Sequence, residues 1–553
     1  MTWDIATALN PSAHVDTFCR DHLPPGDTWP EMIFELPEVR YADRLNCATE
    51  LLTAVIADLG PERPCLLTPN GEGRSGENWS YGELERKANR IATVLTRDLG
   101  VVPGNRVLLR GPNNPWLVAC WFAVLKAGGV VVTTMPLLRP LELTAVAEIA
   151  RVDLALCDVR FVDDLKAARL GGAPIVTYGG PDGDDLAARV TDAADEFTAI
   201  ETSADDVALL AFTSGTTGRP KATMHFHRDV LAIADTFSTH VVRPEPDDVF
   251  TGTPPLAFTF GLGGLVVFPM RVGAATLLVE KATPDELADL IERHAATVCF
   301  TAPTAYRAML RAGRPERLRS LRRAVSAGEH LPASTWHEFL AATGVRLIDG
   351  IGSTEMLHVF ISAADDDIRP GATGKEVPGY RAAVMDEDGN PVPPGTPGRL
   401  AVKGPTGCRY LADPRQAEYV QKGWNFTGDT YLRDEDGYFH YLARRDDMIV
   451  SSGYNIAGPE VEEALAGHPA VNECCVVAAP DPQRGQLVKA YVVLREGVAA
   501  TPELVTELQE FAKRQIAPYK YPRVVEFVES LPRTSTGKVQ RYVLRQRAAA
   551  EPA

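Results

Sequence analysis

A chain of 553 residues is longer than a single hydrophobic core supports, so we expect two or more domains. Its 45% apolar and 23% charged residues are typical of a globular protein, and no segment reaches the roughly 18 apolar residues of a membrane span. The formal net charge of -17 argues against nucleic acid or an anionic membrane surface as the main partner.

The cysteines and the N-terminus bear on the cellular compartment. Nine cysteines are scattered along the chain with no C-x-x-C spacing, which indicates neither a disulfide framework nor a zinc site. The first residues have no basic flank and no continuous apolar stretch of the kind found in a signal peptide. We therefore expect a cytoplasmic protein.

Val- and Leu-rich runs alternate with amphipathic helical patterns such as YGELERKANRIATVLTRDL and TPDELADLIERHA. This alternation predicts an α/β fold with duplicated sheets, in which binding sites lie at the ends of strands. The runs expected to form strands are 105–111, 128–135, 207–215, 274–280, 296–303 and 346–355.

The character of the sequence changes after residue 378. A D-G turn and a P-P-G-x-P-G turn separate short alternating strands, which predicts a small antiparallel, barrel-like subdomain over 379–443. Paired charges and a Ser-Ser-Gly cluster then precede a helix that opens at Pro459. We expect a large domain at 1–443, a hinge at 444–447 and a small, mobile α+β domain at 448–553.

Residues 212–227 read FTSGTTGRPKATMHFH and are rich in Gly, Ser and Thr. After a strand, such small residues let backbone N–H groups converge on an anion, while hydroxyls add donors and a lysine adds charge. The stretch is not a P-loop, because Gly215 and Gly218 are separated by two residues instead of four. Composition alone leaves a flexible surface loop as the alternative. The predicted phosphate cradle comprises Thr213, Ser214, Gly215, Thr216, Thr217, Gly218 and Lys221.

The same stretch resembles the signature loop of the acyl-adenylate-forming superfamily, which includes acyl- and aryl-CoA synthetases, adenylation domains and luciferases. Every fixed position of the pattern [ST]-S-G-[ST]-T-G-x-P-K is matched. Further superfamily motifs follow in order, so the resemblance covers nearly the whole chain. These motifs are GIGSTE (350–355), WNFTGD (424–429), ARRDDMIVSSGYNI (443–456) and LPRTSTGK (531–538).

The resemblance implies ATP, Mg²⁺ and coenzyme A, and a reaction in two halves. A carboxylate attacks the α-phosphorus of ATP to give an acyl adenylate and pyrophosphate, and a thiol then displaces AMP to give a thioester. Between the halves, the small domain is expected to rotate about Asp446. That rotation replaces the Lys538 loop with Gly453, Tyr454 and Asn455, which would line a pantetheine tunnel.

Several motif residues also have a chemical interpretation of their own. Glu355 suits an oxygen ligand for magnesium and Thr354 a phosphate donor, although an S-T-E sequence also caps helices. Asp429, in an expected T-G-D turn, suits the ribose hydroxyls or an Asx-turn. Arg444 resembles the family arginine that reaches the ribose or the phosphates. Lys538 matches the family lysine that contacts the substrate carboxylate and the α-phosphate, whereas an isolated surface lysine is ordinarily inert.

Ile351 stands where most family members carry tyrosine, so an aliphatic side chain is expected against the adenine. This departure and three segments resemble the benzoate and 2-aminobenzoate CoA-ligase branch. The segments are DGIGSTEMLH (349–358), SAGEHLP (326–332) and PPLAFTFGLGG (254–264), and they add Ala327, Gly328, Glu329, Asp349, Gly350 and Gly261 to the expected binding residues.

The acid pocket is expected around two phenylalanines and a histidine. Phe258 takes the position of the gating histidine of the superfamily, and an extended segment would present Phe258 and Phe260 to a flat acid, unless both are plain core. His358 would reach an ortho or meta substituent, unless it is a satisfied structural histidine. We expect an ortho-substituted aryl acid such as 2-aminobenzoate or salicylate.

Three functions from different classes remain open. We favour an aryl-CoA ligase over a stand-alone adenylating enzyme that loads the acid onto the phosphopantetheine of a carrier protein. A non-catalytic, nucleotide-binding regulator is opposed by the intact Lys538, Glu355 and Asp429. The expected partners are a small aromatic acid, ATP and CoA, without nucleic acid or membrane, in a monomer or homodimer.

Overall fold

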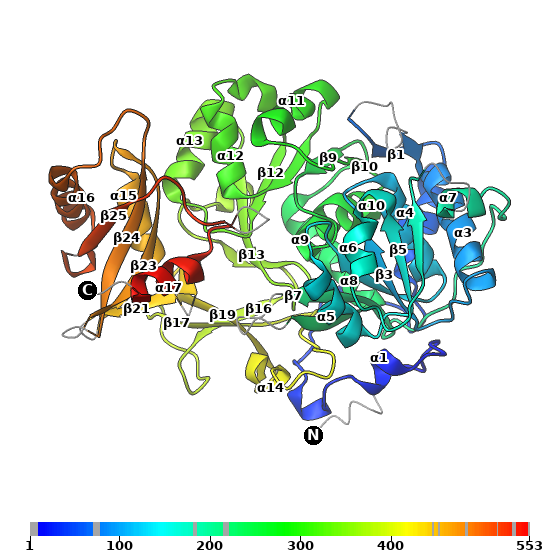
Figure 1. Ribbon diagram of the computed structural model, residues 1–553. Coiled ribbons are helices and arrows are strands. Elements are labelled where there is room, and N and C mark those ends of the chain that lie inside the picture. Colours follow the sequence, from blue (N-terminus) through cyan, green and yellow to red (C-terminus); the bar gives the residue numbers. More distant parts are fainter. Residues whose placement is uncertain are drawn as a thin grey trace. The chain divides into compact units, whose positions relative to one another are not determined.

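The computed structural model describes residues 9–69, 78–180, 185–213, 220–444, 447–451, 454–481, 485–516, 518–533 and 538–550 (Figure 1). The chain forms two compact units. Unit 1 comprises Met1–Ala382 and Val402–Asn425, and unit 2 comprises Ala383–Ala401 and Phe426–Ala553. The hinge expected at 444–447 stays a prediction, because residues 445 and 446 lie outside the described ranges.

The first sheet of unit 1 has six strands in the order β6-β5-β3-β4-β7-β8. All neighbouring pairs are parallel except β7 and β8, which form an antiparallel hairpin. Every residue of β3 and β5 is buried, as expected for parallel strands that are covered on both faces. The strands are β3 (Arg106–Arg110), β4 (Val130–Thr134), β5 (Leu154–Asp158), β6 (Ile175–Tyr178), β7 (Val207–Thr213) and β8 (Lys221–Phe226).

Helices pack on this sheet. Leucine, valine and alanine side chains of α5 and α6 join the strand residues in one apolar core, and α4 contacts β3 and β4 with α3 packed against it. The predicted helix α3 begins with a reciprocal cap, in which the Ser80 side chain accepts from the Glu83 N–H and Glu83 accepts from the Ser80 N–H. The helices are α3 (Tyr81–Arg97), α4 (Pro115–Lys126), α5 (Pro140–Ala150), α6 (Val162–Ala167) and α8 (His227–Ile233).

The second sheet of unit 1 has nine strands in the order β15-β14-β13-β12-β11-β9-β10-β1-β2. The six strands from β13 to β1 in this order are parallel, and the strands beyond them at both edges are antiparallel. The strands are β1 (Pro64–Leu67), β2 (Trp79–Ser80), β9 (Val249–Gly252), β10 (Ala275–Leu277), β11 (Val298–Thr301), β12 (Arg323–Ala327), β13 (Leu347–Gly352), β14 (Val359–Ser362) and β15 (Lys375–Glu376).

Three helices cover one face of the nine-stranded sheet (Figure 1, green). They are α11 (Pro284–His294), α12 (Pro303–Arg311) and α13 (Ala333–Thr343). Their apolar side chains share a core with strand residues such as Leu277, Cys299 and Leu347. The prediction of duplicated α/β sheets is therefore confirmed.

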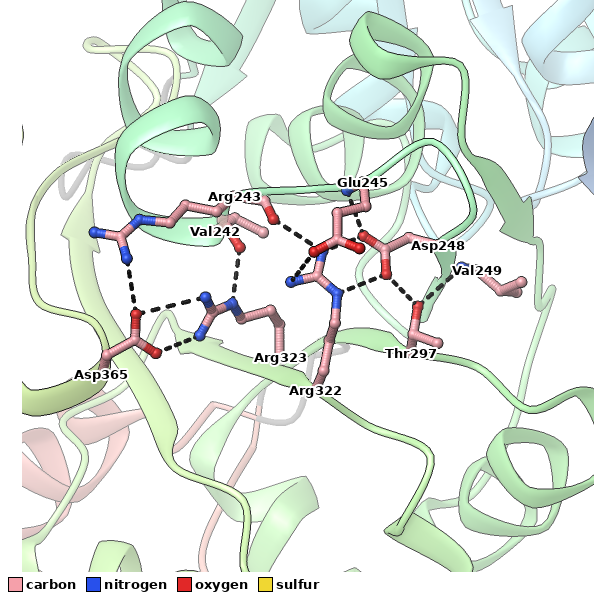
Figure 2. Close-up of polar contacts among 9 residues, drawn as sticks. All are labelled: Val242, Arg243, Glu245, Asp248, Val249, Thr297, Arg322, Arg323 and Asp365. Carbon is pink, nitrogen blue, oxygen red and sulfur yellow. Dashed lines mark hydrogen bonds and ion pairs between the residues drawn. The ribbon is translucent and has the colours of Figure 1, made fainter.

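Hydrogen bonds and ion pairs of charged side chains connect the amino ends of β9, β11 and β12 in this sheet, as Figure 2 shows. The Nε atom of Arg322 lies 2.8 Å from Oδ1 of Asp248, which also accepts from the Thr297 hydroxyl at 2.7 Å. Next to it, Nη1 of Arg323 lies 2.6 Å from Oδ1 of Asp365. Because ligands of open α/β sheets bind at the carboxyl ends of strands, this cluster serves the fold and not the site.

A five-stranded sheet follows in the sequence, with the order β16-β17-β19-β18 and β20 paired to β19. The pairs of β19 with β18 and with β20 are antiparallel. The strands are β16 (Arg381–Met385), β17 (Gly398–Lys403), β18 (Val420–Gln421), β19 (Trp424–Arg433) and β20 (Phe439–Arg444).

The C-terminal part of unit 2 is an α+β module. Its strands have the order β22-β21-β24-β23, with β25 parallel to β24. Side chains of α15 and α16 pack in one apolar core, while α17 packs in a second core that contains Tyr491. The elements are β21 (Met448–Ser451), β22 (Tyr454–Ala457), α15 (Gly458–Ala466), β23 (Val471–Asp481), β24 (Gly485–Leu494), α16 (Pro502–Gln515), β25 (Val524–Phe527) and α17 (Arg541–Ala550). Among the described residues, no helix combines the length and the hydropathy that a membrane span requires.

Candidate active site

The signature loop joins the two strands of the β7–β8 hairpin. Thr213 at the end of β7 pairs directly with Lys221 at the start of β8, so the two ends of the loop lie side by side. They are at the carboxyl end of β7, where binding sites of α/β sheets are found. The predicted cradle residues Ser214, Gly215, Thr216, Thr217 and Gly218 lie outside the described residues.

Lys221, Tyr410 and Glu355 form a chain of hydrogen bonds at this end of the hairpin. The Nζ atom of Lys221 donates to the phenolic oxygen of Tyr410 at 2.6 Å, and the phenol donates to Oε1 of Glu355 at 2.5 Å. Lys221 Nζ lies 3.7 Å from the same carboxylate oxygen. Burial and the neighbouring Glu355 charge raise the pKa of Tyr410, so the phenol stays protonated and acts as the donor.

Thr354 and Glu355 lie in the loop between β13 and β14, at the carboxyl end of β13. The Thr354 carbonyl oxygen lies 2.9 Å from Nε2 of His225, a fully buried residue of β8. The other ring nitrogen of His225 lies 3.9 Å from Oδ2 of Asp229, whose carboxylate is paired with the buried guanidinium of Arg409. The motif loop of one sheet is thus fixed by a histidine of the other.

The ends of β12 and β13 meet beside this loop. Ala327, the last residue of β12, pairs with Gly350 of β13, so the two segments predicted to bind ligand are neighbours. Gly328 follows with a φ of +88°, a left-handed conformation that favours glycine. Glu329 and Ile351 are half-buried.

Asp349 is the titratable residue of β13. Burial raises the pKa of its carboxyl group to about 8, against a weaker opposing hydrogen bond from the Gly350 backbone. Its Oδ1 atom is buried and has no hydrogen-bond partner in the described part of the chain. A buried carboxyl oxygen of this kind suits a ligand that brings an N–H donor.

His358 lies inside a group of aromatic rings. Its ring centroid is 5.6 Å from that of Phe260 and 4.6 Å from that of Phe268, with Phe237 and Phe300 close by. Only 3% of the residue is exposed, and neither ring nitrogen has a side-chain hydrogen-bond partner within the described residues, although a weak backbone contact with Phe260 opposes the effect of burial on its pKa. Burial lowers the pKa of His358 to about 3, so the imidazole is neutral at physiological pH.

Close packing around His358 requires glycine on the facing helical turn. A Cβ atom on Gly263 would lie 2.4 Å from Cδ2 of His358, and one on Gly264 would lie 2.5 Å from the Phe300 ring. Both residues begin η7 (Gly263–Val267), a π-helical segment of the kind that often marks functional sites. Gly261 is equally restricted, because its Cβ would meet the Pro255 carbonyl oxygen at 2.2 Å.

The expected arrangement of Phe258 and Phe260 is wrong in one respect. The segment is not extended, because α9 (Thr259–Leu262) begins directly after Phe258. Residues two positions apart in a helix point in different directions, so the two rings do not share one side by strand alternation. Phe260 packs beside His358, while Phe258 is the half-buried residue that precedes the helix.

The predicted ATP residues of unit 2 form an ion pair. Asp429 and Arg444 are direct partners across β19 and β20, with Nη1 of Arg444 3.0 Å from Oδ1 of Asp429. The expected T-G-D turn is wrong, because Asp429 lies within β19, although Gly428 has a left-handed φ of +79°. The buried Asp429 and the more exposed Arg444 thus present a carboxylate and a guanidinium together.

The remaining predicted residues of unit 2 are only partly described. Lys538 is exposed in the segment before α17. Tyr454 and Asn455 are the first residues of β22, while Gly453 and Asp446 lie outside the described residues. Their roles therefore stay predictions.

Two families of known sequences match this chain. Residues 55–410 match the AMP-binding enzyme family, and residues 460–538 match the AMP-binding enzyme C-terminal domain. The chain belongs to the AMP-binding enzymes. It is an AMP-forming acid–thiol ligase, whose reaction uses ATP, Mg²⁺ and coenzyme A.

Relatives extend over nearly the whole chain. The benzoate–CoA ligase of Thauera aromatica is 34% identical over 522 residues, which cover 92% of this chain and 97% of that protein. The crystal structure of the anthranilate CoA ligase AuaEII with anthranoyl-AMP superposes with a TM-score of 0.87 at 31% identity, covering 93% of this chain and 99% of that one. A benzoate CoA ligase from Burkholderia xenovorans LB400 gives a TM-score of 0.82 at 31% identity, covering 91% and 100%. The resemblance to the benzoate and 2-aminobenzoate branch is confirmed.

The side chains around Glu355 fit a magnesium ion of such an enzyme. Mg²⁺ is bound by hard oxygen ligands, commonly one or two carboxylates together with substrate phosphates and water. Glu355 and the Thr354 hydroxyl supply such oxygens, and no group of three or more His, Cys, Asp or Glu gathers as a metal cage in the described ranges. The donor set suits an ion that is shared with a nucleotide.

The sequence motifs did not identify Tyr410 or His225 as a residue of the site. Both belong to short stretches, CRYL and MHFH, in which a polar residue interrupts apolar ones. A polar residue within an apolar strand pattern is expected to be buried and therefore to need a hydrogen-bond partner. This pattern could have identified both residues from the sequence.

Proposed function

We propose that this enzyme is an ATP-dependent aryl-CoA ligase for a benzoate-type acid with an ortho substituent, such as 2-aminobenzoate or salicylate. The observation that carries the proposal is the neutral, buried imidazole of His358, which lies among phenylalanine rings and has no side-chain hydrogen-bond partner in the described part of the chain. An aromatic acid matches the rings, and an amino or hydroxyl substituent supplies the missing hydrogen bond. The names of the relatives, which state benzoate and anthranilate, agree with this choice.

In the first half reaction, a carboxylate oxygen of the acid attacks the α-phosphorus of ATP and pyrophosphate leaves. Mg²⁺, when bound, neutralises part of the phosphate charge. Glu355 and Thr354 are proposed to hold the ion and a phosphate, while the cradle residues, Lys221 and Lys538 meet the negative charge of the transition state. Asp429 and Arg444 are proposed to bind the ribose, with Asp349, Gly350 and Ile351 beside the adenine.

In the second half reaction, the sulfur of coenzyme A attacks the acyl carbon and AMP leaves. We propose that the small domain turns about Asp446 between the halves, so that Gly453, Tyr454 and Asn455 replace Lys538. The domain limits 1–443, 444–447 and 448–553 belong to this proposal. Loading of a carrier-protein phosphopantetheine is the alternative fate of the adenylate.

A pyrophosphate-release screen tests the substrate class. Benzoate, 2-, 3- and 4-substituted hydroxy- and aminobenzoates, naphthoates, cinnamates and medium-chain fatty acids are compared at equal concentrations. The proposal expects the highest kcat/KM for a 2-substituted benzoate, and a clear preference for an alkyl acid would overturn it. Titration of the acyl adenylate with free CoA then identifies the acceptor, because a carrier-dependent enzyme leaves free CoA unacylated. A cytoplasmic location and a monomeric or homodimeric state remain proposals.

A further inference from the structure

Tyr410 places a neutral hydroxyl between two oppositely charged groups of the site. We propose that Tyr410 is a positioning residue whose phenol keeps the Lys221–Glu355 ion pair from closing into a direct hydrogen bond, which leaves the carboxylate for Mg²⁺ and the ammonium for phosphate. The inference rests on the proposed roles of Lys221 and Glu355. It concerns a residue that belongs to none of the motifs discussed above.

The distances support a spacer. Lys221 Nζ and Glu355 Oε1 are 3.7 Å apart, which is longer than the roughly 2.7–2.9 Å of a charge-assisted N–H···O hydrogen bond. Both contacts through the phenol are shorter, at 2.6 Å from Nζ and 2.5 Å to Oε1. The phenolic oxygen is therefore within hydrogen-bond distance of both groups, while the two groups stay beyond that distance from each other.

A spacer must be held in place independently of the groups that it separates, and the contacts of Tyr410 meet this requirement. Its backbone N–H donates to Oε1 of Gln416 at 2.8 Å, and the next residue, Leu411, donates to the Ala222 carbonyl at 2.9 Å. Tyr410 also forms an isolated antiparallel bridge with Thr223. These contacts attach the segment to the edge of β8, and none involves Lys221 or Glu355.

The ring is held as firmly as the backbone. Tyr410 is fully buried, and its ring packs edge to face on Tyr419 with centroids 5.8 Å apart. The phenolic oxygen can therefore move little when a neighbour changes.

The two separated groups come from different sheets. Lys221 opens β8 of the six-stranded sheet, while Glu355 follows β13 of the nine-stranded sheet. A direct ion pair would commit a carboxylate lone pair to the ammonium and reduce the charge that each group offers to a ligand. The hydrogen bond from the phenol also uses a lone pair of Glu355 Oε1, but the phenol is neutral and does not cancel the charge of the carboxylate.

The first experiment measures binding of ATP at increasing Mg²⁺ concentration, by calorimetry and without any acid. Tyr410→Phe removes the hydroxyl and keeps the ring. We expect the half-saturating Mg²⁺ concentration to rise roughly tenfold, as found for partners that orient metal ligands, while ATP affinity in EDTA changes much less. Tyr306→Phe is the control, since it also removes one buried phenol, whose hydroxyl donates to the Cys299 carbonyl of β11 at 2.8 Å. It should titrate like the wild type.

The second experiment is a double-mutant cycle with Lys221→Met. If Tyr410 acts by separating the two charges, its replacement by Phe should change the half-saturating Mg²⁺ less than about twofold once the ammonium is gone. An equal rise with and without Lys221 would overturn the spacer role, and so would an unchanged Mg²⁺ requirement in Tyr410→Phe alone.

The single Lys221→Met variant keeps the proposal testable if Tyr410→Phe does not fold. While Tyr410 separates the two groups, Lys221 does not compete with Mg²⁺ for Glu355. Removal of the Lys221 ammonium should therefore not lower the half-saturating Mg²⁺ concentration. A several-fold decrease would contradict the proposal. Because no acid is present, the result does not depend on the proposed substrate, whose failure would appear separately as absent pyrophosphate release.

Discussion

The Nε2 atom of His225 lies 2.9 Å from the backbone carbonyl oxygen of Thr354. A carbonyl oxygen only accepts, so Nε2 carries the proton and donates it. His225 is fully buried in β8, and the hydrogen bond spans two sheets of unit 1. It fixes the backbone of the loop that carries Thr354 and Glu355.

Replacement of His225 should therefore disturb the motif loop without touching a ligand. In His225→Leu, the Thr354 carbonyl loses its donor, which should cost about 1–3 kcal/mol of unfolding free energy. We expect kcat/KM for pyrophosphate release to fall about tenfold, mostly through a higher KM for ATP. Unfolding in urea and initial rates at varied ATP measure the two effects.

His225→Gln is the conservative variant, because its amide offers an N–H donor of similar reach. In this variant the KM for ATP should return most of the way to the wild-type value. If Gln and Leu raised the KM for ATP equally, the hydrogen bond to Thr354 would not be what positions the loop.

His358→Ala should distinguish substituted from unsubstituted acids. A hydrogen bond from a neutral side chain is worth about 0.5–1.5 kcal/mol, so kcat/KM for 2-aminobenzoate or salicylate should fall roughly threefold to tenfold more than for benzoate. The comparison needs both acids on the same enzyme preparation. Equal losses would remove His358 from recognition of the substituent.

Motifs located part of this site because they fix residues that are close in sequence. Thr213 and Lys221 end one loop, and Thr354 and Glu355 adjoin in another, so the members of each pair lie together in the fold, while their roles stay predictions. The contacts of Tyr410 with Lys221 and Glu355 span 189 and 55 residues and depend on how two sheets pack. No local pattern encodes such a distance.

The failures at Phe258 and Asp429 have a different cause. The segment of Phe258 and Phe260 was expected to be extended, but the Phe258 N–H donates to the Pro255 carbonyl and the chain continues into the short helix α9. Asp429 looked like a turn residue because Gly428 precedes it, yet pairing with β20 keeps it in a strand. In the second case a tertiary contact decided the local conformation.

Asp349 makes stability depend on pH. Its pKa is raised from the ordinary aspartate value to about 8, so between roughly pH 4 and pH 8 the folded protein holds a proton that the unfolded chain has released. This contribution to stability is present at low pH and is lost as the pH rises toward 8. The slope from one such group is at most about 1.4 kcal/mol per pH unit.

Asp349→Asn removes this titration and keeps the shape of the side chain. The unfolding free energy of the wild type, relative to the variant, should fall by about 2–3 kcal/mol between pH 5 and pH 7. Urea denaturation of both proteins at the two pH values measures the difference. A constant difference would show that Asp349 binds the same number of protons in the folded and unfolded states across this range.

Variants of Lys538 and Gly453 should each lose a different half reaction if the small domain brings these two residues to the active site in turn. Lys538→Ala removes one charge-assisted contact to the developing phosphoryl charge, which should slow adenylation by roughly 10²–10³. Conversion of a supplied acyl adenylate with CoA should persist. In Gly453→Leu, a side chain enters the proposed tunnel, so ATP–pyrophosphate exchange should continue while thioester formation falls. Both half reactions are measured separately on each variant, with the fold checked by circular dichroism. A parallel loss of both halves in each folded variant would exclude the alternating mechanism for this enzyme.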